Sequence, residues 1–106
     1  MVYARFNLSR GPRKDLPVRF AWDKAKAAAN LKKHGVSFEE AVTVFFDPLA
    51  ATFPDPDHSV GEDRLITVGV SARGRLLVVC HVERQHGIRI ISVRRAAPGE
   101  RKRHEN

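Results

Sequence analysis

Three consecutive apolar segments restrict the fold of this chain more than any other feature. Val, Ile and Leu, which are typical strand residues, dominate residues 65–71, 76–83 and 88–95. The turns between these segments are short, and short turns join strands that run antiparallel. The pattern therefore predicts a three-stranded antiparallel meander.

A short strand and a helix are predicted near the start of the chain. Residues 18–22 alternate between apolar and other side chains, as a strand does. Asp23 is a typical N-cap for a helix over residues 24–34, and Gly35 is suited to end that helix in a left-handed conformation.

A second helix follows after only two residues. Ser37 and Glu40 form a capping box, in which Ser37 reaches forward and Glu40 reaches back. Apolar residues then recur at helical spacing until the Asp47-Pro48 stop, and residues 49–53 resemble a short edge strand. After Pro98-Gly99, residues 100–105 are predicted to form a short charged helix.

Helices that are separated from a run of strands predict an α+β domain. We expect an antiparallel meander with two N-terminal helices packed on one face and a short C-terminal helix. At 106 residues the chain has room for one domain, assigned to residues 18–106. Residues 1–17 are expected to be a loose basic extension.

The composition narrows the cellular setting. There is no apolar run long enough to span a membrane, and no apolar segment typical of a secretory signal near the N-terminus. The single Cys80 cannot form an intramolecular disulfide, which fits the cytoplasm, and it lies in an apolar run where a packed thiol is expected.

Positive charge is concentrated at the two ends of the chain. The net charge is +7 and the isoelectric point is about 10.3. Residues 1–19 carry a net +4 and residues 84–106 a net +5, whereas residues 20–83 carry −2. This distribution favours a polyanion partner, RNA or DNA rather than a membrane, although an acidic protein would also satisfy it.

The pairing of the strands decides which polar side chains meet. A two-residue turn at Arg73-Gly74 places Arg64 opposite Glu83, whereas one extra residue in that turn exchanges the faces. The second hairpin is expected to pair Glu83 with Ile88 and His81 with Ile90. Strict alternation then puts Arg94 on the same face as His81 and Glu83.

This set of side chains suits RNA cleavage without a metal. Glu83 or His81 is a candidate base for the 2′-OH proton, and His104 is a candidate donor to the leaving group. Arginine binds phosphate through two parallel hydrogen bonds, and the candidates are Arg64, Arg84, Arg89 and Arg94. Further candidate RNA contacts are Lys33, Arg89, Arg95, Arg101 and Lys102.

Simpler interpretations remain open for the same residues. Arg64 and Glu83 alone would make a cross-strand ion pair, with His81 as a polar residue on that face. Asp55, Asp57 and His58 are adequate metal ligands, but the surrounding prolines favour a plain exposed turn. No metal or cofactor is expected.

Several motifs occur together in an order that is specific. They are Phe20-Ala21-Trp22-Asp23, Lys26, Asn30, residues 33–41 (Lys-His-Gly-Val-Ser-Phe-Glu-Glu-Ala), Asp47-Pro48, Arg64, Gly69, Glu83-Arg84, residues 89–92 (Arg-Ile-Ile-Ser), Arg94, Ala96, Glu100 and Arg101. Over residues 18–105 the chain resembles the BrnT family of type II toxins.

The resemblance implies a RelE-like fold and a ribonuclease toxin that arrests translation, with RNA as substrate, free or on the ribosome. It also implies a BrnA-like antitoxin, through which alone the toxin would reach operator DNA. Site residues carried over by position are Arg64, Glu83, Arg84, Arg89 and Arg94.

This chain departs from the family at His104, where a tyrosine is usual. Histidine can still stack on a base and can donate a proton. Two competing hypotheses are a non-catalytic nucleic-acid-binding module and an inactive toxin relative that persists as a partner of the antitoxin.

Overall fold

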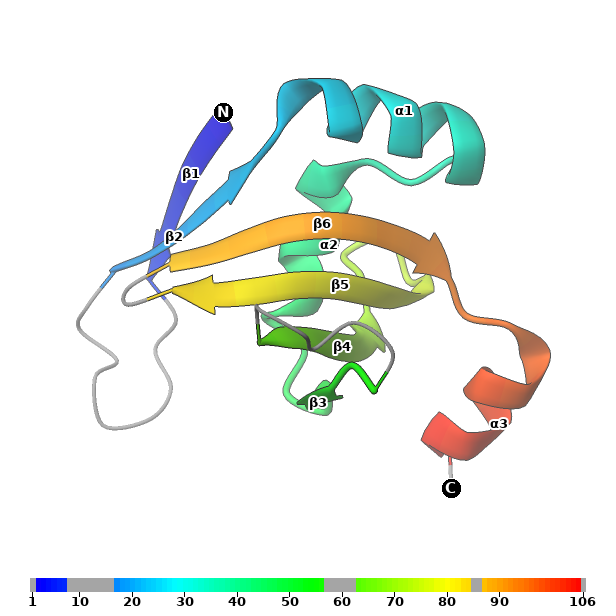
Figure 1. Ribbon diagram of the computed structural model, residues 1–106. Coiled ribbons are helices and arrows are strands. Elements are labelled where there is room, and N and C mark those ends of the chain that lie inside the picture. The colour runs from blue at the N-terminus through cyan, green and yellow to red at the C-terminus, as the bar shows by residue number, and fades with distance from the viewer. Residues whose placement is uncertain (1, 8–16, 57–62, 85–86, 106) are drawn as a thin grey trace.

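The fold combines α-helices with one β-sheet. The computed structural model describes residues 2–7, 17–56, 63–84 and 87–105 (Figure 1). Along the chain, the elements are β1 (Val2–Asn7), β2 (Pro17–Trp22), α1 (Lys24–His34), α2 (Phe38–Val44), β3 (Ala51–Pro54), β4 (Arg64–Val70), β5 (Leu76–Arg84), β6 (Gly87–Arg95) and α3 (Pro98–Glu105).

Within the described ranges six strands form one sheet, in the order β1-β2-β6-β5-β4-β3. Strands β4, β5 and β6 form the predicted antiparallel meander. The sheet as a whole is mixed, because β2 pairs with β6 in parallel, a pairing that the sequence did not predict. A parallel pair needs a long connection, and the helices together with the meander supply it.

The N-terminal segment contains a strand, contrary to the expectation of a loose extension. Residues 2–7 form β1, which pairs antiparallel with β2 from Val2 opposite Trp22 to Asn7 opposite Pro17. Residues 8–16 lie outside the described ranges. The sheet therefore begins ahead of the domain boundary that the sequence predicts.

The ends of α1 confirm the local signals in the sequence. The Asp23 carboxylate accepts hydrogen bonds from the backbone N–H groups of Ala25 and Lys26, which lowers the pKa of Asp23. Gly35 adopts the left-handed conformation with φ of 69° and donates its N–H to the Leu31 carbonyl. Helix α1 spans the predicted residues.

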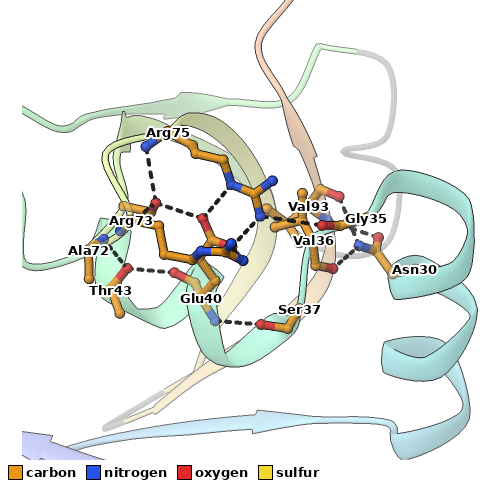
Figure 2. Close-up of polar contacts among 11 residues, drawn as sticks. Asn30, Gly35, Val36, Ser37, Glu40, Thr43, Ala72, Arg73, Arg75 and Val93 are labelled. Carbon is orange, nitrogen blue, oxygen red and sulfur yellow. Dashed lines mark hydrogen bonds and ion pairs between the residues drawn. The ribbon is translucent and has the colours of Figure 1, made fainter.

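Only half of the predicted capping box forms at α2. Ser37 caps the helix by accepting from the Glu40 N–H. The Glu40 carboxylate does not reach back. It accepts hydrogen bonds from Ser71 and Arg75, and Arg73 adds a weaker ion pair at 3.7 Å (Figure 2). The hydrogen bond from Arg75 is the main cause that lowers the pKa of Glu40.

This network attaches α2 to the loop between β4 and β5. Arg75 also donates to the Gly35 carbonyl, and Thr43 accepts from the Ala72 N–H at 2.8 Å (Figure 2). Glu40 is 7% exposed, so its negative charge is buried among these partners. The β4–β5 loop is thus held by α2, although β3 and β4 separate the two in sequence.

The main core lies between the helices and one face of the sheet. Its central residues come from β2, the turn before α2, α2 itself, β5 and β6: Phe20, Trp22, Val36, Phe38, Ala41, Val42, Val44, Leu77, Val79, Ile88, Ile90 and Val93. We call this the helix-covered face. The opposite face of the sheet, which α1 and α2 leave uncovered, is called the open face.

Asn30 connects α1 to the backbone of β6. Its amide nitrogen donates to the carbonyls of Val36 and Val93, and its amide oxygen accepts from the Val93 N–H (Figure 2). Strand β2 pairs with β6 only as far as Arg89, so Val93 lies beyond that ladder. The Asn30 side chain therefore replaces a missing strand neighbour for Val93.

Candidate functional site

The first hairpin adopts the register with one extra residue in its loop. Arg64 pairs with Val82 and Leu65 with His81, so Arg64 and Glu83 lie on opposite faces. Gly74 has φ of 77°, and Ser71 pairs with Arg75 across the loop. A three-residue loop with a left-handed last residue is a common alternative to the two-residue turn. The predicted Arg64–Glu83 pair is therefore wrong.

The second hairpin pairs as predicted up to a β-bulge. Glu83 lies opposite Ile88 and His81 opposite Ile90, but Cys80 lies opposite Ser92, so Ile91 has no partner in the ladder. One extra residue reverses the alternation beyond it. Arg94 consequently moves to the open face, away from the face that His81 and Glu83 share.

The bulge gathers basic side chains on the open face. Arg89 pairs with Val82, and Arg94 pairs with Val78. Both partners lie on the open face, because they occupy the positions of β5 that alternate with the core residues Leu77 and Val79. By the same register four of the predicted arginines share this face: Arg64, Arg84, Arg89 and Arg94.

A cavity of about 670 Å³ lies on the open face, between the sheet and α3. Its walls come from β3, β4, β5, the end of β6 and α3, which follows β6 on the side away from α1 (Figure 1). The lining residues are Ala51, Phe53, Asp55, Pro56, Ile66, Val68, Val78, Arg94, Glu100, Arg103 and His104. Two predicted residues, Arg94 and His104, thus meet at one cavity.

Arg94 is held in place by the first turn of α3. It donates from both terminal nitrogens to the two oxygens of Glu100, each at 2.7 Å. Glu100 also accepts from the Ala97 N–H at 2.8 Å. The paired arginine is the main cause that lowers the pKa of Glu100 to about 2, so this carboxylate is a poor proton acceptor.

A second carboxylate borders the same cavity. Asp55 is 4% exposed, which corrects the expectation of an exposed turn, and its backbone N–H donates to the Arg64 carbonyl at 2.9 Å. Cys80 donates its thiol to Asp55 at 3.6 Å. Burial is the main cause that raises the pKa of Cys80, so the thiol is not an activated nucleophile. Asp57 and His58 lie outside the described ranges.

His81 belongs to the core. It is fully buried, its ring packs edge-on against Phe45 at 4.9 Å, and Nε2 lies 2.7 Å from Thr67 Oγ1. Burial lowers the pKa of His81 to about 4, so the ring is neutral at pH 7. The prediction that His81 is a catalytic base is wrong, because nothing on the open face can reach it.

The remaining predicted residues are spread over the surface. Glu83 and Arg95 are exposed, and their partners Ile88 and Leu77 place them on the helix-covered side. Lys33 is exposed in the last turn of α1, where its charge suits the helix dipole. Arg101 and Lys102 are exposed on α3 but do not line the cavity.

Four charged or aromatic residues of the cavity were not among the predicted site residues. Phe53, Asp55, Glu100 and Arg103 come from β3, the turn after it and α3. The sequence could have indicated Glu100, because this residue is one of the family motifs given in the sequence analysis. Phe53 and Arg103 become visible only when the register is known. Among the described residues, no group of three or more potential metal ligands occurs.

Comparison with known proteins agrees with the motifs. Residues 22–100 match the family described as ribonuclease toxin, BrnT, of type II toxin–antitoxin systems.

The chain belongs to the BrnT toxin family.

A solved BrnT structure shares the fold. The crystal structure of the Brucella abortus ribonuclease toxin BrnT superimposes with a TM-score of 0.59 at 25% sequence identity. The match covers 74% of this chain and 95% of that chain. No curated protein matches the chain. None of the helices in the described ranges is long and apolar enough to cross a membrane.

Proposed function

We propose that this BrnT family member is a metal-independent endoribonuclease that cleaves RNA on its open face and so inhibits translation. The observation that carries the proposal is that four arginines share the open face with the cavity that Arg94 and His104 line. A basic surface next to a cavity with proton-transfer groups is what phosphodiester cleavage requires.

The reaction would use the RNA itself as nucleophile. A base takes the 2′-OH proton, the 2′ oxygen attacks the adjacent phosphorus, and the bond from phosphorus to the 5′ oxygen breaks. The leaving 5′ oxygen receives a proton from an acid. The products are a 2′,3′-cyclic phosphate and a 5′-hydroxyl, and no metal takes part in this balance.

Arginines supply the charge that the transition state needs. Arg64 and Arg89 lie on either side of Val82 in one row across the open face, roughly 10 Å apart at ~4.8 Å per strand. That spacing suits contacts to successive phosphates. Arg94 lines the cavity itself, and we assign it to the scissile phosphate.

Proton transfer is assigned to cavity residues. His104 lines the cavity, and an imidazole can both accept and donate a proton. Of the two carboxylates there, Glu100 has a pKa lowered to about 2 by Arg94, which makes it a poor proton acceptor, so we assign Asp55 as the base. This pair replaces Glu83 and His81, which lie on the other side of the sheet.

The biological setting follows the family. Type II toxins have a protein antitoxin, and we propose a BrnA-like DNA-binding antitoxin as the partner in the cytoplasm. Operator DNA would be reached only through that complex. The RelE-like relationship and a ribosomal location of the substrate belong to this proposal as well.

The test is cleavage of end-labelled RNA by the purified free protein in EDTA. Wild type should yield fragments with a 2′,3′-cyclic phosphate, and a substrate with 2′-O-methyl groups should resist. Arg94→Ala should lose at least about 100-fold in rate if it meets the scissile phosphate. Arg95→Ala is the matched control, since it removes the same charge from the neighbouring residue on the other face.

The outcomes separate the candidate functions. Equal losses of cleavage rate in Arg94→Ala and Arg95→Ala would contradict the placement of the site on the open face. RNA retention without cleavage, in EDTA and in a translating extract alike, would instead support the non-catalytic binding module. Asp55→Asn and His104→Ala should alter opposite limbs of the pH–rate profile, and an unchanged profile would contradict the assigned acid and base.

A further inference from the structure

Phe53 is an exposed aromatic residue at a cavity that also contains two arginines and two carboxylates. Its side chain is 44% exposed, although it lies on the face of β3 that borders the cavity. None of the ring contacts found among the described residues involves Phe53. Covering such a ring with a ligand gains hydrophobic free energy.

The strand register places Phe53 and Arg94 on opposite sides of the cavity. Ala51, Val68, Val78 and Arg94 form one row across four strands, and Phe53 lies two residues further along β3. Three strand spacings amount to roughly 14 Å between the ends of this row. The long Arg94 side chain and the Phe53 ring extend into the space above it.

The third wall is the last part of α3. Arg103 and His104 line the cavity from the side opposite the sheet. The site therefore combines an apolar floor, formed by Ile66, Val68 and Val78, with the Arg94–Glu100 pair and Arg103 at one end. The Phe53 ring and Asp55 lie at the other end. A cavity of about 670 Å³ lies in the range of small-ligand sites, which is about 300–1,000 Å³.

A nucleotide has this distribution of chemistry. Its phosphate is anionic, its base is flat and apolar on both faces, and the sugar separates them by about the length of a side chain. Proteins that hold single-stranded nucleic acid stack bases on exposed aromatic rings next to arginines. An apolar protein segment would offer Arg94 and Arg103 no anion beyond Glu100, which already pairs with Arg94.

We propose that the cavity is a nucleobase subsite in which Phe53 stacks on a base of single-stranded RNA while Arg94 and Arg103 face its phosphate. This inference rests on the proposed function, since the RNA is the same substrate. It adds a specific contact that neither the motifs nor the predicted site residues contain.

The subsite predicts a requirement for an aromatic ring at position 53. Base–aromatic stacking contributes about 1–3 kcal/mol per base, so Phe53→Ala should weaken binding of a 2′-O-methyl oligonucleotide roughly tenfold. Phe53→Leu keeps an apolar side chain without a π face and should lose nearly as much. Phe53→Tyr should bind as wild type does.

Phe46→Ala is the matched control. Phe46 is 41% exposed, similar to Phe53, but it lies outside the cavity. Its substitution should change affinity less than twofold. If Phe46→Ala and Phe53→Ala weaken binding equally, a general effect on the fold explains the result and the subsite is refuted.

A double-mutant cycle separates stacking from other roles. An oligonucleotide with one abasic position should bind wild type about tenfold more weakly, while Phe53→Ala should not distinguish it from the intact oligonucleotide. Additive losses at every abasic position tested would overturn the proposal. The titration is followed by fluorescence anisotropy of the labelled oligonucleotide.

The cycle is independent of catalysis. Strong coupling between Phe53 and the base, in a protein that does not cleave RNA, would support the subsite and contradict the proposed ribonuclease activity. Cleavage of RNA without such coupling would support the ribonuclease activity and contradict the stacking role of Phe53. A protein partner that competes only with wild type, while oligonucleotides show no coupling, would assign the cavity to protein binding instead and contradict the subsite.

Discussion

Arg94 and Glu100 are six residues apart and form a two-bond ion pair of 2.7 Å and 2.7 Å at the mouth of the cavity. The pair attaches α3 to the end of β6. It also occupies the arginine that the proposed function assigns to a phosphate. A phosphate that binds Arg94 must therefore compete with a carboxylate of the same chain.

Glu100→Gln should strengthen RNA binding, because it removes that competitor. We expect affinity for a 2′-O-methyl oligonucleotide to rise about two- to fivefold. The variant should lose no more than about 1 kcal/mol of unfolding free energy, since the side chains of Arg94 and Glu100 are 44% and 27% exposed. Glu39→Gln, an exposed change of equal charge, is the control. Equal gains in both variants would point to net charge alone.

The salt dependence of binding should report the open-face arginines one by one. For single strands the slope of log affinity against log salt changes by about 0.7 for each phosphate contact. Arg64→Ala and Arg89→Ala should each reduce the slope by about that amount, whereas Arg95→Ala should leave it unchanged. A reduced slope for Arg95→Ala would show that RNA also binds the helix-covered side.

His81 should make the fold sensitive to mild acid. The unfolded chain takes up a proton near pH 6.5, whereas burial lowers the pKa of His81 to about 4 in the fold. Its contribution is thus complete above pH 6.5, declines as the pH falls from 6.5 to about 4, and is constant below that. The decline is on the order of 3 kcal/mol.

Chemical denaturation of wild type and His81→Gln at a series of pH values measures this difference. The variant lacks the titrating group, so the two stability curves should converge as the pH falls from 6.5 to 4. Parallel curves in that window would show that the ring is not buried in its neutral form. His81 Nδ1 has no hydrogen-bond partner among the described residues, which suits an unprotonated nitrogen and a proton on Nε2.

Glu40→Gln should destabilise the protein without affecting RNA binding. Removing one member of a buried ion pair costs about 3–5 kcal/mol, and the partial exposure of Arg75 at 21% places the expected loss near the lower end. Glu39→Gln, one residue away and exposed, should change stability by less than about 0.5 kcal/mol. Similar losses in the two variants would contradict the Glu40–Arg75 pair.

Asn30→Ala should cost about 2–4 kcal/mol of unfolding free energy. Three backbone groups of Val36 and Val93 lose their partner, and buried polar groups without partners cost about 1–3 kcal/mol each. Hydrogen exchange adds a local readout, because the Val93 amide should lose protection first. Undiminished protection of that amide would show that another group can replace the Asn30 side chain.

Local signals predicted local structure well. Asp23 and Gly35 mark the ends of α1 because the cap interactions are made within one turn of the helix. The second hairpin paired as expected near its loop for the same reason. Long-range choices were less visible: nothing near Glu40 in sequence indicates that its carboxylate binds Ser71 and Arg75 rather than its own helix.

The candidate site could be predicted only in part. The arginines were identifiable from chemistry and motifs, but their faces depended on the extra residue in the first hairpin loop and on the bulge at Ile91. Strict alternation therefore grouped Arg94 with His81, which lies in the core. Phe53 was not predicted as a site residue, because the sequence of a short exposed edge strand does not show which of its side chains borders a cavity.

The bulge at Ile91 has a genetic consequence. It makes β6 two half-strands of opposite phase, and the one residue without a ladder partner separates them. An in-frame loss of the Ile91 codon would restore strict alternation and leave Ser92 and Arg94 on the open face and Val93 toward the helices. Such a deletion would therefore preserve the basic surface, although it shortens a central strand.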